Sequence, residues 1–286
     1  MSTPIGILGG SGLYAMEGLE VQERRPVKTP WGEPSGPLVF GRLNGVEVAF
    51  LARHGEGHRF LPTEVPYRAN LWAFKEAGVS TVLSVSAVGS LQPQHVPGTL
   101  RLPDQFIDRT VKREATFFGA GLAAHVGFGD PLCPWLRGHL LETGRALGLP
   151  IEPCGAYVCM EGPAFSTRAE SRMYRSWGAD LIGMTNLTEA KLAREAELCY
   201  ATIALVTDFD AWRESEGAVE THDVLEVMAA NVAKAKALLS AVVARLGGER
   251  SCPCGSSLAH ALMTTPEHVP EATRTKLRLL VGKYGY

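Results

Sequence analysis

The chain has 286 residues, of which 45% are hydrophobic and 20% are charged, and its formal net charge is −2. A chain of this length and composition suits one large globular domain or two small ones. The near-neutral balance, without a long basic run, argues against a surface that coats nucleic acid. Because no apolar stretch reaches the length of a membrane span and the N-terminus lacks the pattern of a secretory signal, we expect a cytoplasmic protein without a membrane partner.

The first part of the chain consists mainly of predicted strands and turns. Residues 4–8 form a short apolar strand that enters the glycine turn at residues 9–12. Further on, the strong turn signal Asn44-Gly45 separates two apolar segments and predicts a hairpin. Apolar residues at helical spacing then predict a helix that ends at Gly78. The nearly continuous apolar run at residues 79–88 predicts a strand covered on both faces of its sheet.

Strands and helices alternate through the rest of the chain. We expect strands at residues 155–160, 181–184 and 199–206, helices at 136–147, 168–177 and 187–197, and a long amphipathic helix with apolar positions from 225 to 242. Such alternation is typical of α/β architecture. A polar break follows at residues 247–255, and a short helical tail runs from there to the end of the chain.

The acidic segment Thr207-Asp208-Phe209-Asp210 is the most informative stretch, because it follows the apolar run at residues 199–206. In an open α/β sheet, ligands bind where strands run out into loops. If the chain stays extended, Asp208 and Asp210 point to the same side and face one ligand. Such a pair suits a ligand with two adjacent nitrogens, such as a purine edge, although alone it also fits a metal site or a solvated loop.

The glycine turn at residues 9–12 has more than one interpretation. Successive backbone N–H groups with the Ser11 hydroxyl would form a phosphate clamp. The same residues also fit part of a dinucleotide-binding fingerprint, which needs an acid about 20 residues further on at the end of a second strand. Glu33 has that distance but lies in a loop rich in Pro and Gly, so this reading is weak. A plain tight turn is the third interpretation.

Several other predicted strands also end in residues that suit a ligand. Arg53 offers a planar fork for phosphate, although an Arg-His pair is often simply at the surface. Ser86 could donate to an anion or pack against a helix, and Phe165 could stack on an aromatic ligand or belong to the core. Because so many residues that suit a ligand occur at predicted strand ends, we expect them to share a single ligand site. The residues at predicted strand ends are Ser11, Arg53, Ser86, Phe165, Thr185 and Asp208.

The six cysteines do not suggest a disulfide scaffold in a chain this long. Cys159 and Cys199 lie in apolar, strand-like runs and should be buried thiols. Cys252-Pro253-Cys254 stands apart, since zinc sites usually present two spaced pairs and no second pair lies nearby in the sequence. A local redox pair or a strained disulfide is an alternative, but two free surface thiols are the simpler expectation.

Long motifs in one order, spread over roughly residues 4 to 245, resemble the 5′-methylthioadenosine phosphorylase branch of the purine nucleoside phosphorylase superfamily. A set of this kind is far more specific than one glycine loop. The motifs are Gly-Ile-Leu-Gly-Gly-Ser-Gly from Gly6, Leu-Ala-Arg-His-Gly from Leu51, Ser-Ala-Val-Gly-Ser from Ser86, Asp-Gln-Phe-Ile-Asp-Arg-Thr from Asp104, Glu-Gly-Pro-Ala-Phe-Ser-Thr-Arg-Ala-Glu from Glu161, Leu-Ala-Arg-Glu-Ala-Glu from Leu192 and Thr-Asp-Phe-Asp-Ala-Trp from Thr207.

The resemblance implies a fold and a reaction. The fold would be a single α/β domain of the nucleoside phosphorylase type, with a central mixed β-sheet flanked by helices on both faces. It would span residues 1–246, and the tail at residues 247–286 would pack on the same domain. The reaction would be phosphorolysis of S-methyl-5′-thioadenosine in purine and methionine salvage, with inorganic phosphate as co-substrate and neither cofactor nor metal. Homotrimers, or hexamers made of two trimers, would complete the site across an interface.

The resemblance also assigns roles to individual residues. Asp208 would be the general acid at the purine imidazole nitrogen, which requires a raised pKa, and Asp210 would accept from the exocyclic amine. Ser166, where relatives that prefer oxopurines carry Glu, favours a 6-aminopurine. The phosphate site would consist of Ser11, Arg53, His54, Ser86, Ala87 and Thr185. The nucleoside would further contact Phe165, Met184, Thr221, Val224 and Leu225, with His125 reaching in from a neighbouring subunit. Methylthioinosine or another purine nucleoside is the alternative substrate.

Overall fold

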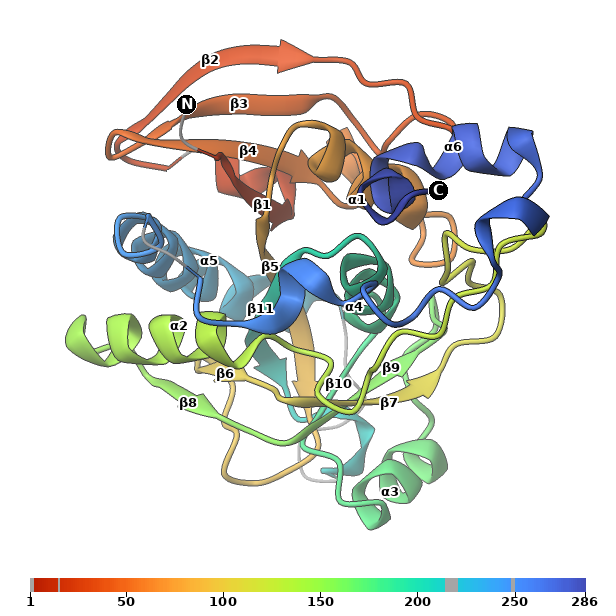
Figure 1. Ribbon diagram of the computed structural model, residues 1–286. Coiled ribbons are helices and arrows are strands. Elements are labelled where there is room, and N and C mark those ends of the chain that lie inside the picture. The colour runs from red at the N-terminus through yellow and green to blue at the C-terminus, as the bar shows by residue number, and fades with distance from the viewer. Residues whose placement is uncertain (1–2, 15, 214–220, 248–249) are drawn as a thin grey trace.

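The computed structural model describes residues 3–14, 16–213, 221–247 and 250–286, with the backbone only at residues 11, 14 and 221–226. One sheet of eleven strands forms its centre (Figure 1). The main path is β2-β3-β4-β1-β5-β10-β9-β7, while β11 pairs with β5 and β6, and β8 with β6. The strands are β1 Ile5–Gly9, β2 Leu19–Arg25, β3 Leu38–Leu43, β4 Val46–Ala52, β5 Thr81–Ser90, β6 Leu100–Leu102, β7 Gln105–Arg109, β8 Ile151–Pro153, β9 Ala156–Met160, β10 Leu181–Gly183 and β11 Cys199–Asp208.

The pairing directions around β5 determine which strand ends meet. β1, β4, β5 and β11 run parallel to their neighbours in this group, so their carboxyl ends open at one edge of the sheet. β10 instead runs antiparallel to the end of β5, with Leu181 opposite Ser90 and Ile182 opposite Gly89. The chain that leaves β10 therefore returns alongside the middle of β5. The sheet is mixed, as the resemblance implied.

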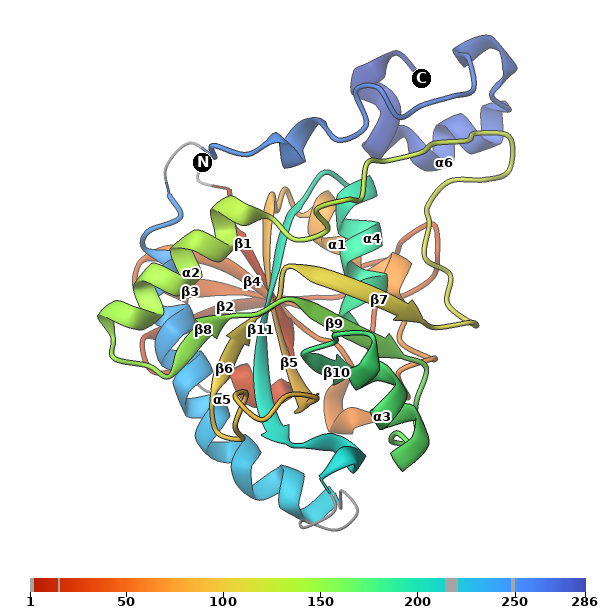
Figure 2. The same cartoon turned by 90° about the horizontal axis from the view of Figure 1, so that it is seen from below.

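Helices cover both faces of the sheet, which the view in Figure 2 makes clear. The alternating side chains of β11 explain this, since Ala201 and Ile203 join one apolar cluster and Tyr200 joins another on the opposite face. The first cluster includes residues of α2 and α5, and the second includes residues of α1, α4 and α6. The helices are α1 Tyr67–Glu76, α2 Pro134–Ala146, α3 Arg168–Ser176, α4 Asn186–Glu195, α5 Thr221–Val243 and α6 Glu271–Val281.

Most elements expected from the sequence are confirmed, including the hairpin of β3 and β4 and the helices α1 to α5. The edge strand β2 and the short strands β6, β7 and β8 were not predicted from the sequence. After β1 the chain forms only a short 3₁₀ helix, Ser11–Tyr14, and then enters β2. A dinucleotide-binding unit needs an α-helix at this point, so the structure contradicts that reading of the glycine turn.

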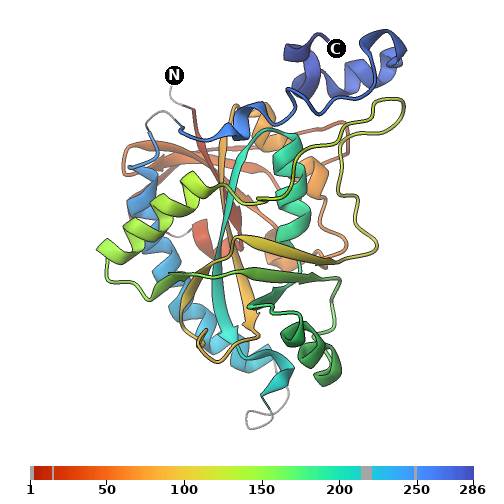
Figure 3. The same ribbon diagram turned by 60° about the horizontal axis from the view of Figure 1, so that its bottom comes forward.

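The C-terminal tail runs along the long loop at residues 110–133, as Figures 1 and 3 show. The His125 N–H donates to Ala261 O at 2.8 Å. On the other side of the tail, Leu258 and Leu277 share an apolar cluster with Phe74 of α1. Lys283 forms an ion pair of 2.5 Å with Glu197. Among the described helices, none combines the length and apolarity that crossing a lipid bilayer requires.

Candidate active site

Asp208 and Asp210 lie together over Gly89, near the carboxyl ends of β11 and β5. A side chain at Gly89 would place its Cβ 3.0 Å from Asp208 Oδ2 and 3.3 Å from Asp210 Cβ. The absence of a side chain at Gly89 therefore lets the two acids approach the backbone of β5, and a Cβ there would force them to shift. The acidic pair predicted from the sequence is thus a real structural unit at an exit of the sheet.

The two acids are brought together by a turn, so the expectation of a continuing extended chain was wrong. β11 reaches Asp208, Phe209 has φ −99° and ψ 25°, and Asp210 has a positive φ of 48° and begins a short 3₁₀ helix, Asp210–Trp212. The Asp210 N–H donates to Asp208 Oδ2 at 2.9 Å, and the Thr207 hydroxyl donates to Asp208 Oδ1 at 2.6 Å. The backbone of the turn therefore orients the side chain of the half-buried Asp208.

Asp210 has a buried carboxyl group with unused hydrogen-bonding capacity. In the described part of the chain, its Oδ2 has no hydrogen-bond partner. Burial raises the pKa of Asp210 above its ordinary value, while the nearby hydroxyls of Ser171 and Ser166 act in the opposite direction. Buried polar atoms are normally paired, so this oxygen is suited to accept a hydrogen bond from a ligand.

The loop after β9 carries Phe165 and Ser166 beside the acids. A reciprocal capping box of Thr167 and Glu170 starts α3 at Arg168, which fixes the end of this loop. Ser166 is buried, and its hydroxyl lies 3.7 Å from Met160 Sδ. Phe165 is 48% exposed, so it is not a core residue, which was the alternative to a stacking role.

Arg113, which was not among the predicted site residues, joins the ends of β9 and β10. Its Nε donates to Glu161 Oε1 at 2.8 Å, and its Nη1 donates to Met184 O at 2.9 Å. Gly162 packs so closely on Met184 that a Cβ there would lie 2.6 Å from the sulfur. The guanidinium group therefore holds the half-buried Met184 next to the loop that carries Phe165.

Ser86 and Thr185 form a second polar pair, with hydroxyl oxygens 3.5 Å apart. Ser86 lies inside β5, four positions before its end at Ser90, and not at the strand exit that the sequence predicted. The antiparallel course of β10 explains why Thr185 reaches it. Thr185 is the N-cap of α4 without a side-chain capping bond. Two hydroxyls at a helix N-terminus suit an anion, and the exposed Ala87 adjoins them.

Arg53 is buried in an ion pair with Glu189 of α4, and this pair was not expected from the sequence. Its Nε donates to Glu189 Oε1, and its Nη2 donates to Glu189 Oε2 at 3.1 Å. The same guanidinium donates to Ser84 Oγ at 2.6 Å and to Val85 O at 2.8 Å. Much of the planar fork is therefore engaged within the protein, directly behind Ser86.

Further buried side chains extend this ion pair into a network. Tyr200 OH donates to Glu189 Oε2 at 2.6 Å, and Asn186 Nδ2 donates to Ser84 Oγ and to Tyr200 OH, both at 2.9 Å. Buried charges are tolerated when they are paired and hydrogen-bonded. The network consequently fixes the first turn of α4 against β5 and β11.

His54 lies at the end of β4 as a neutral imidazole. Its Nδ1 is 2.8 Å from Phe60 O, and its ring stacks on that of His58 at 4.2 Å. Burial, together with the positive charge of Arg53, lowers the pKa of His54 to about 4. At neutral pH the Nδ1–H therefore donates to the carbonyl, and Nε2 is left as an acceptor.

The remaining predicted site residues fall into two groups. The side chains of Ser11, Thr221, Val224 and Leu225 lie outside the described part of the structure. His125 is exposed on the loop at residues 110–133, beside the tail. It lines a surface cavity of about 400 Å³ with Phe118, Leu122 and Thr264, and none of the other candidate residues lines this cavity.

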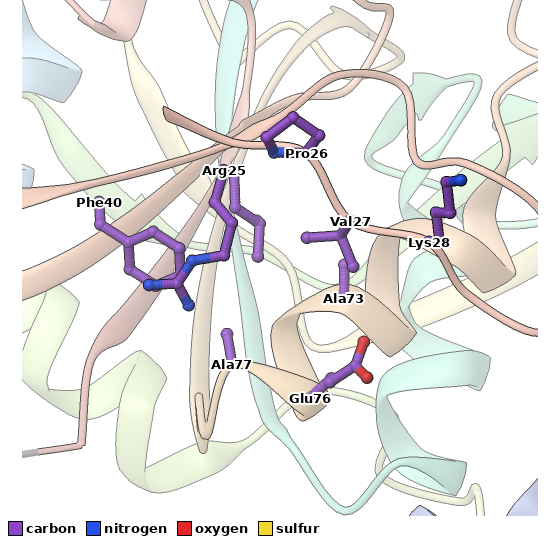
Figure 4. Close-up of a pocket in the computed structure, with 9 residues that line it drawn as sticks. Arg25, Pro26, Val27, Lys28, Phe40, Ala73, Glu76 and Ala77 are labelled. Atoms are coloured by element: carbon purple, nitrogen blue, oxygen red, sulfur yellow. The ribbon is translucent and has the colours of Figure 1, made fainter. Parts of the chain in front are cut away.

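A separate pocket of about 260 Å³ lies between β2, β3 and α1, as Figure 4 shows. Arg25 stacks over Phe40 there at 4.4 Å. None of the candidate residues lines this pocket, so it is distinct from the acidic pair. Its lining consists of Arg25, Pro26, Val27, Lys28, Leu38, Phe40, Ala73, Glu76 and Ala77.

The expectation of two free surface thiols at Cys252 and Cys254 was wrong. Cys254 is buried and Cys252 is half-buried, so they are not two surface thiols. A second cysteine pair, Cys133 and Cys199, also lies beside them in space. Tertiary folding places these pairs together, and sequence spacing alone gave no sign of it.

The chain is similar to known proteins over almost its whole length. Residues 4–244 match the family model described as the phosphorylase superfamily. The S-methyl-5′-thioadenosine phosphorylase of Koribacter versatilis (strain Ellin345) is 54% identical, with 99% of this chain and 97% of that protein covered.

Solved structures also resemble the chain closely. A methylthioadenosine phosphorylase from an antarctic soil metagenomic library has a TM-score of 0.92 at 48% identity, over 98% of this chain and 99% of that one. The methylthioadenosine phosphorylase of Schistosoma mansoni, in complex with adenine, has a TM-score of 0.82 at 37% identity, over 87% and 93% of the two chains.

Proposed function

The chain belongs to the phosphorylase superfamily, in the branch of the S-methyl-5′-thioadenosine phosphorylases, and on this premise we propose that it cleaves S-methyl-5′-thioadenosine with inorganic phosphate. The products are adenine and 5-methylthioribose 1-phosphate. The names of relatives at 54% and 48% identity support this substrate. The reaction would return adenine and the methylthioribose unit to salvage.

One observation carries the proposal, namely the acidic pair over Gly89 with the unpaired, buried Asp210 Oδ2. Adenine presents an exocyclic amine beside an imidazole nitrogen, which matches two carboxyl groups that are joined by a short turn. Asp210 Oδ2 accepts from the amine. An oxopurine would place a carbonyl oxygen against this oxygen, and two acceptors left unpaired in a buried site disfavour binding.

The chemical step exchanges one bond for another. A phosphate oxygen attacks the anomeric carbon, the bond from that carbon to the purine nitrogen breaks, and its electron pair goes to the base. Asp208 delivers its proton to the imidazole nitrogen, so adenine leaves as a neutral molecule. Asp208 accepts hydrogen bonds from Asp210 N–H and Thr207, which suits the carboxylate that remains after the transfer. General acid catalysis of this kind contributes typically about 10²- to 10⁴-fold to the rate.

The phosphate site is proposed beside Ser86 and Thr185, at the N-terminus of α4. The two hydroxyls donate to phosphate oxygens, and the neutral His54 accepts from a protonated one. Arg53 belongs to the same site in this proposal, where it holds the N-terminus of α4 in place through its ion pair with Glu189. Ser11 and Ala87 belong to the same site in this proposal.

The nucleoside and its 5′ substituent complete the site. Phe165 lies against the base, Ser166 leaves room for a 6-aminopurine, and Met184 contacts the ribose. Thr221, Val224 and Leu225 of α5 are proposed to enclose the methylthio group. His125 reaches the site of a neighbouring subunit in a trimer or hexamer, which fits its exposure.

The test mixes the purified protein with phosphate and methylthioadenosine and measures adenine release. We expect release that depends on phosphate and that greatly exceeds release of hypoxanthine from methylthioinosine under the same conditions. A preference for methylthioinosine would shift the assignment to the alternative substrate. Binding of the nucleoside without any turnover would mean that the protein is not this enzyme.

A further inference from the structure

Four cysteines from distant parts of the chain meet at the amino end of β11. Cys133 is the N-cap of α2, Cys199 is the first residue of β11, and Cys252 and Cys254 flank Pro253 at the beginning of the tail. Their four sulfur atoms all lie within 4.8 Å of one another. Three of the four residues are buried and Cys252 is half-buried.

Hydrogen bonds of the main chain and of the Arg250 side chain support this arrangement without involving the cysteine side chains. The Cys133 N–H donates to Tyr200 O at 2.9 Å, which ties the start of α2 to β11. The Cys199 N–H donates to Ser80 O at 2.9 Å, and Arg250 Nη1 donates to the same Ser80 O at 2.9 Å. Main-chain bonds therefore hold Cys133 and Cys199 beside each other, and the Arg250 side chain ties the beginning of the tail to the same point.

We propose that Cys133, Cys199, Cys252 and Cys254 bind one zinc ion as a structural tetrathiolate site. In such sites the Zn–S distance is about 2.3 Å, so the sulfur atoms of a tetrahedron are roughly 3.8 Å apart. In this chain Cys199 Sγ and Cys252 Sγ are 3.1 Å apart, and every sulfur pair lies within 4.8 Å. The sulfur–sulfur distance that a zinc tetrahedron requires, roughly 3.8 Å, thus lies between the 3.1 Å of this pair and the 4.8 Å limit of the whole set. Four protein ligands leave no position for substrate, so the ion is structural.

The surroundings suit the charge of this site. Zinc binds thiolates, so each thiol gives up its proton and the complete site carries two negative charges. Arg250 Nη1 lies 3.5 Å from Cys199 Sγ, where its positive charge offsets part of that excess. Gly255 leaves space for this guanidinium, since a Cβ there would lie 3.1 Å from Arg250 Nη2.

The competing fate of the same thiols is a pair of disulfide bonds. Disulfides need two close pairs with sulfur atoms at about 2.0 Å, and they do not require the two pairs to adjoin. Cys199 and Cys252, at 3.1 Å, are not bonded. A tetrathiolate metal centre, in contrast, requires all four sulfur atoms to be neighbours, as they are here.

The experiment uses the full chain, purified with a phosphine reductant, and measures zinc by inductively coupled plasma mass spectrometry. We expect one zinc per chain. The stripped, reduced protein is then titrated with Co²⁺, which in a tetrathiolate site develops a thiolate-to-metal charge-transfer band and intense visible d–d bands.

Cys252→Ser is the test variant, because Cys252 is only half-buried and its loss leaves the core intact. Cys154→Ser is the matched control, since Cys154 is also half-buried but lies outside the cluster. We expect the zinc content to fall at least tenfold in Cys252→Ser and to stay unchanged in Cys154→Ser. The melting temperature should fall when wild type is stripped of zinc and recover when zinc is added back.

Two results would overturn the zinc site. One is wild-type protein that stays metal-free and develops no cobalt charge-transfer band although all four thiols titrate as reduced. The other is peptide mapping that finds disulfides among these cysteines in protein kept under reductant. Adenine release is assayed separately, so failure of the zinc site and failure of the proposed reaction are distinguishable.

Discussion

The two ends of β11 differ in how completely the protein satisfies its own polar groups. At the carboxyl end, Asp208 is half-buried and the neighbouring Asp210 keeps an oxygen without a partner among the described residues. At the amino end, roughly 30 Å away along ten residues of strand, Cys199 belongs to a closed set of four thiols. The open end is built for a ligand that comes and goes, whereas the closed end joins segments of the fold. Changes at the first end should affect turnover, and changes at the second end should affect stability.

Replacing the acid at the open end should have the largest effect on turnover. We expect Asp208→Asn to lower kcat by about 10²-fold or more, because the amide cannot transfer the proton to the base. The melting temperature should change little, since Asn is close in size and can still accept from Asp210 N–H. Steady-state adenine release and thermal denaturation measure the two effects.

Asp104→Asn is the matched control, because Asp104 is also half-buried but lies between β6 and β7. It should keep the wild-type kcat. If Asp208→Asn retained full turnover, the general-acid role would be excluded.

Arg53→Ala should affect stability although Arg53 lies at the open end, because its ion pair with Glu189 is buried beneath the site. We expect unfolding to become easier by about 3–5 kcal/mol, since Glu189 would be left buried without its partner. Chemical denaturation measures this loss. Arg145→Ala, which breaks the exposed pair of Arg145 with Glu152, should cost at most about 1 kcal/mol.

A double variant sharpens this prediction. Arg53→Ala combined with Glu189→Ala should be less destabilised than the sum of the single variants. Additive losses would show that the two side chains do not stabilise each other.

The far end of α4 offers a test by pH. Burial raises the pKa of Glu195 to about 7, although its carboxylate accepts hydrogen bonds from Phe117 N–H and Thr116. The folded state thus holds a proton that the unfolded state releases near pH 4.5. Its contribution is complete below pH 4.5 and is lost as the pH rises to about 7, and it amounts to about 3 kcal/mol at most.

Denaturation of Glu195→Gln, measured between pH 4.5 and 8, should remove this part of the pH dependence. Activity per folded molecule should stay unchanged, since Glu195 lies at the opposite end of α4 from Thr185. Identical pH profiles for the two proteins would contradict the raised pKa.

The smallest effect is expected for Thr185→Val. Loss of one hydroxyl that donates to a charged oxygen should raise the KM for phosphate about tenfold. Thr188→Val is the control on the same helix, because Thr188 is buried and its hydroxyl has no partner in the described structure. A similar KM in both variants would argue against phosphate binding at the N-terminus of α4.

Much of the open end could be predicted because apolar strands are recognisable and ligand groups follow them. Asp208, Thr185 and Arg53 were predicted in this way, and all three lie at or just after the end of a strand. Ser86 was wrongly predicted to lie at a strand exit. β5 continues for four more residues to Ser90, and these mostly small residues do not show from sequence whether the strand continues or ends. The turn at Phe209 also could not be foreseen, because the positive φ of Asp210 depends on packing around it.

The buried network and the cysteine cluster could not be predicted because both are products of tertiary structure. Ser84 and Tyr200 lie within apolar runs and look like ordinary strand residues. Cys199 and Cys252 are 53 residues apart in sequence but 3.1 Å apart in space. The edge strand β2 was missed because its side chains are almost all exposed, so no alternation marks it.

The pairing of β11 with β5 has a consequence for insertions and deletions. Val206 pairs with Val88 and Asp208 with Gly89, so β11 has one residue more than β5 over this stretch. The extra residue is Thr207, whose hydroxyl oxygen also lies 3.2 Å from Val88 O. Without Thr207, Asp208 would shift by one position in the register, and its carboxyl group would face the other side of the sheet. The chemistry at this strand end therefore depends on the number of residues in it as much as on their identity, and a change of length here could not be repaired by any single substitution.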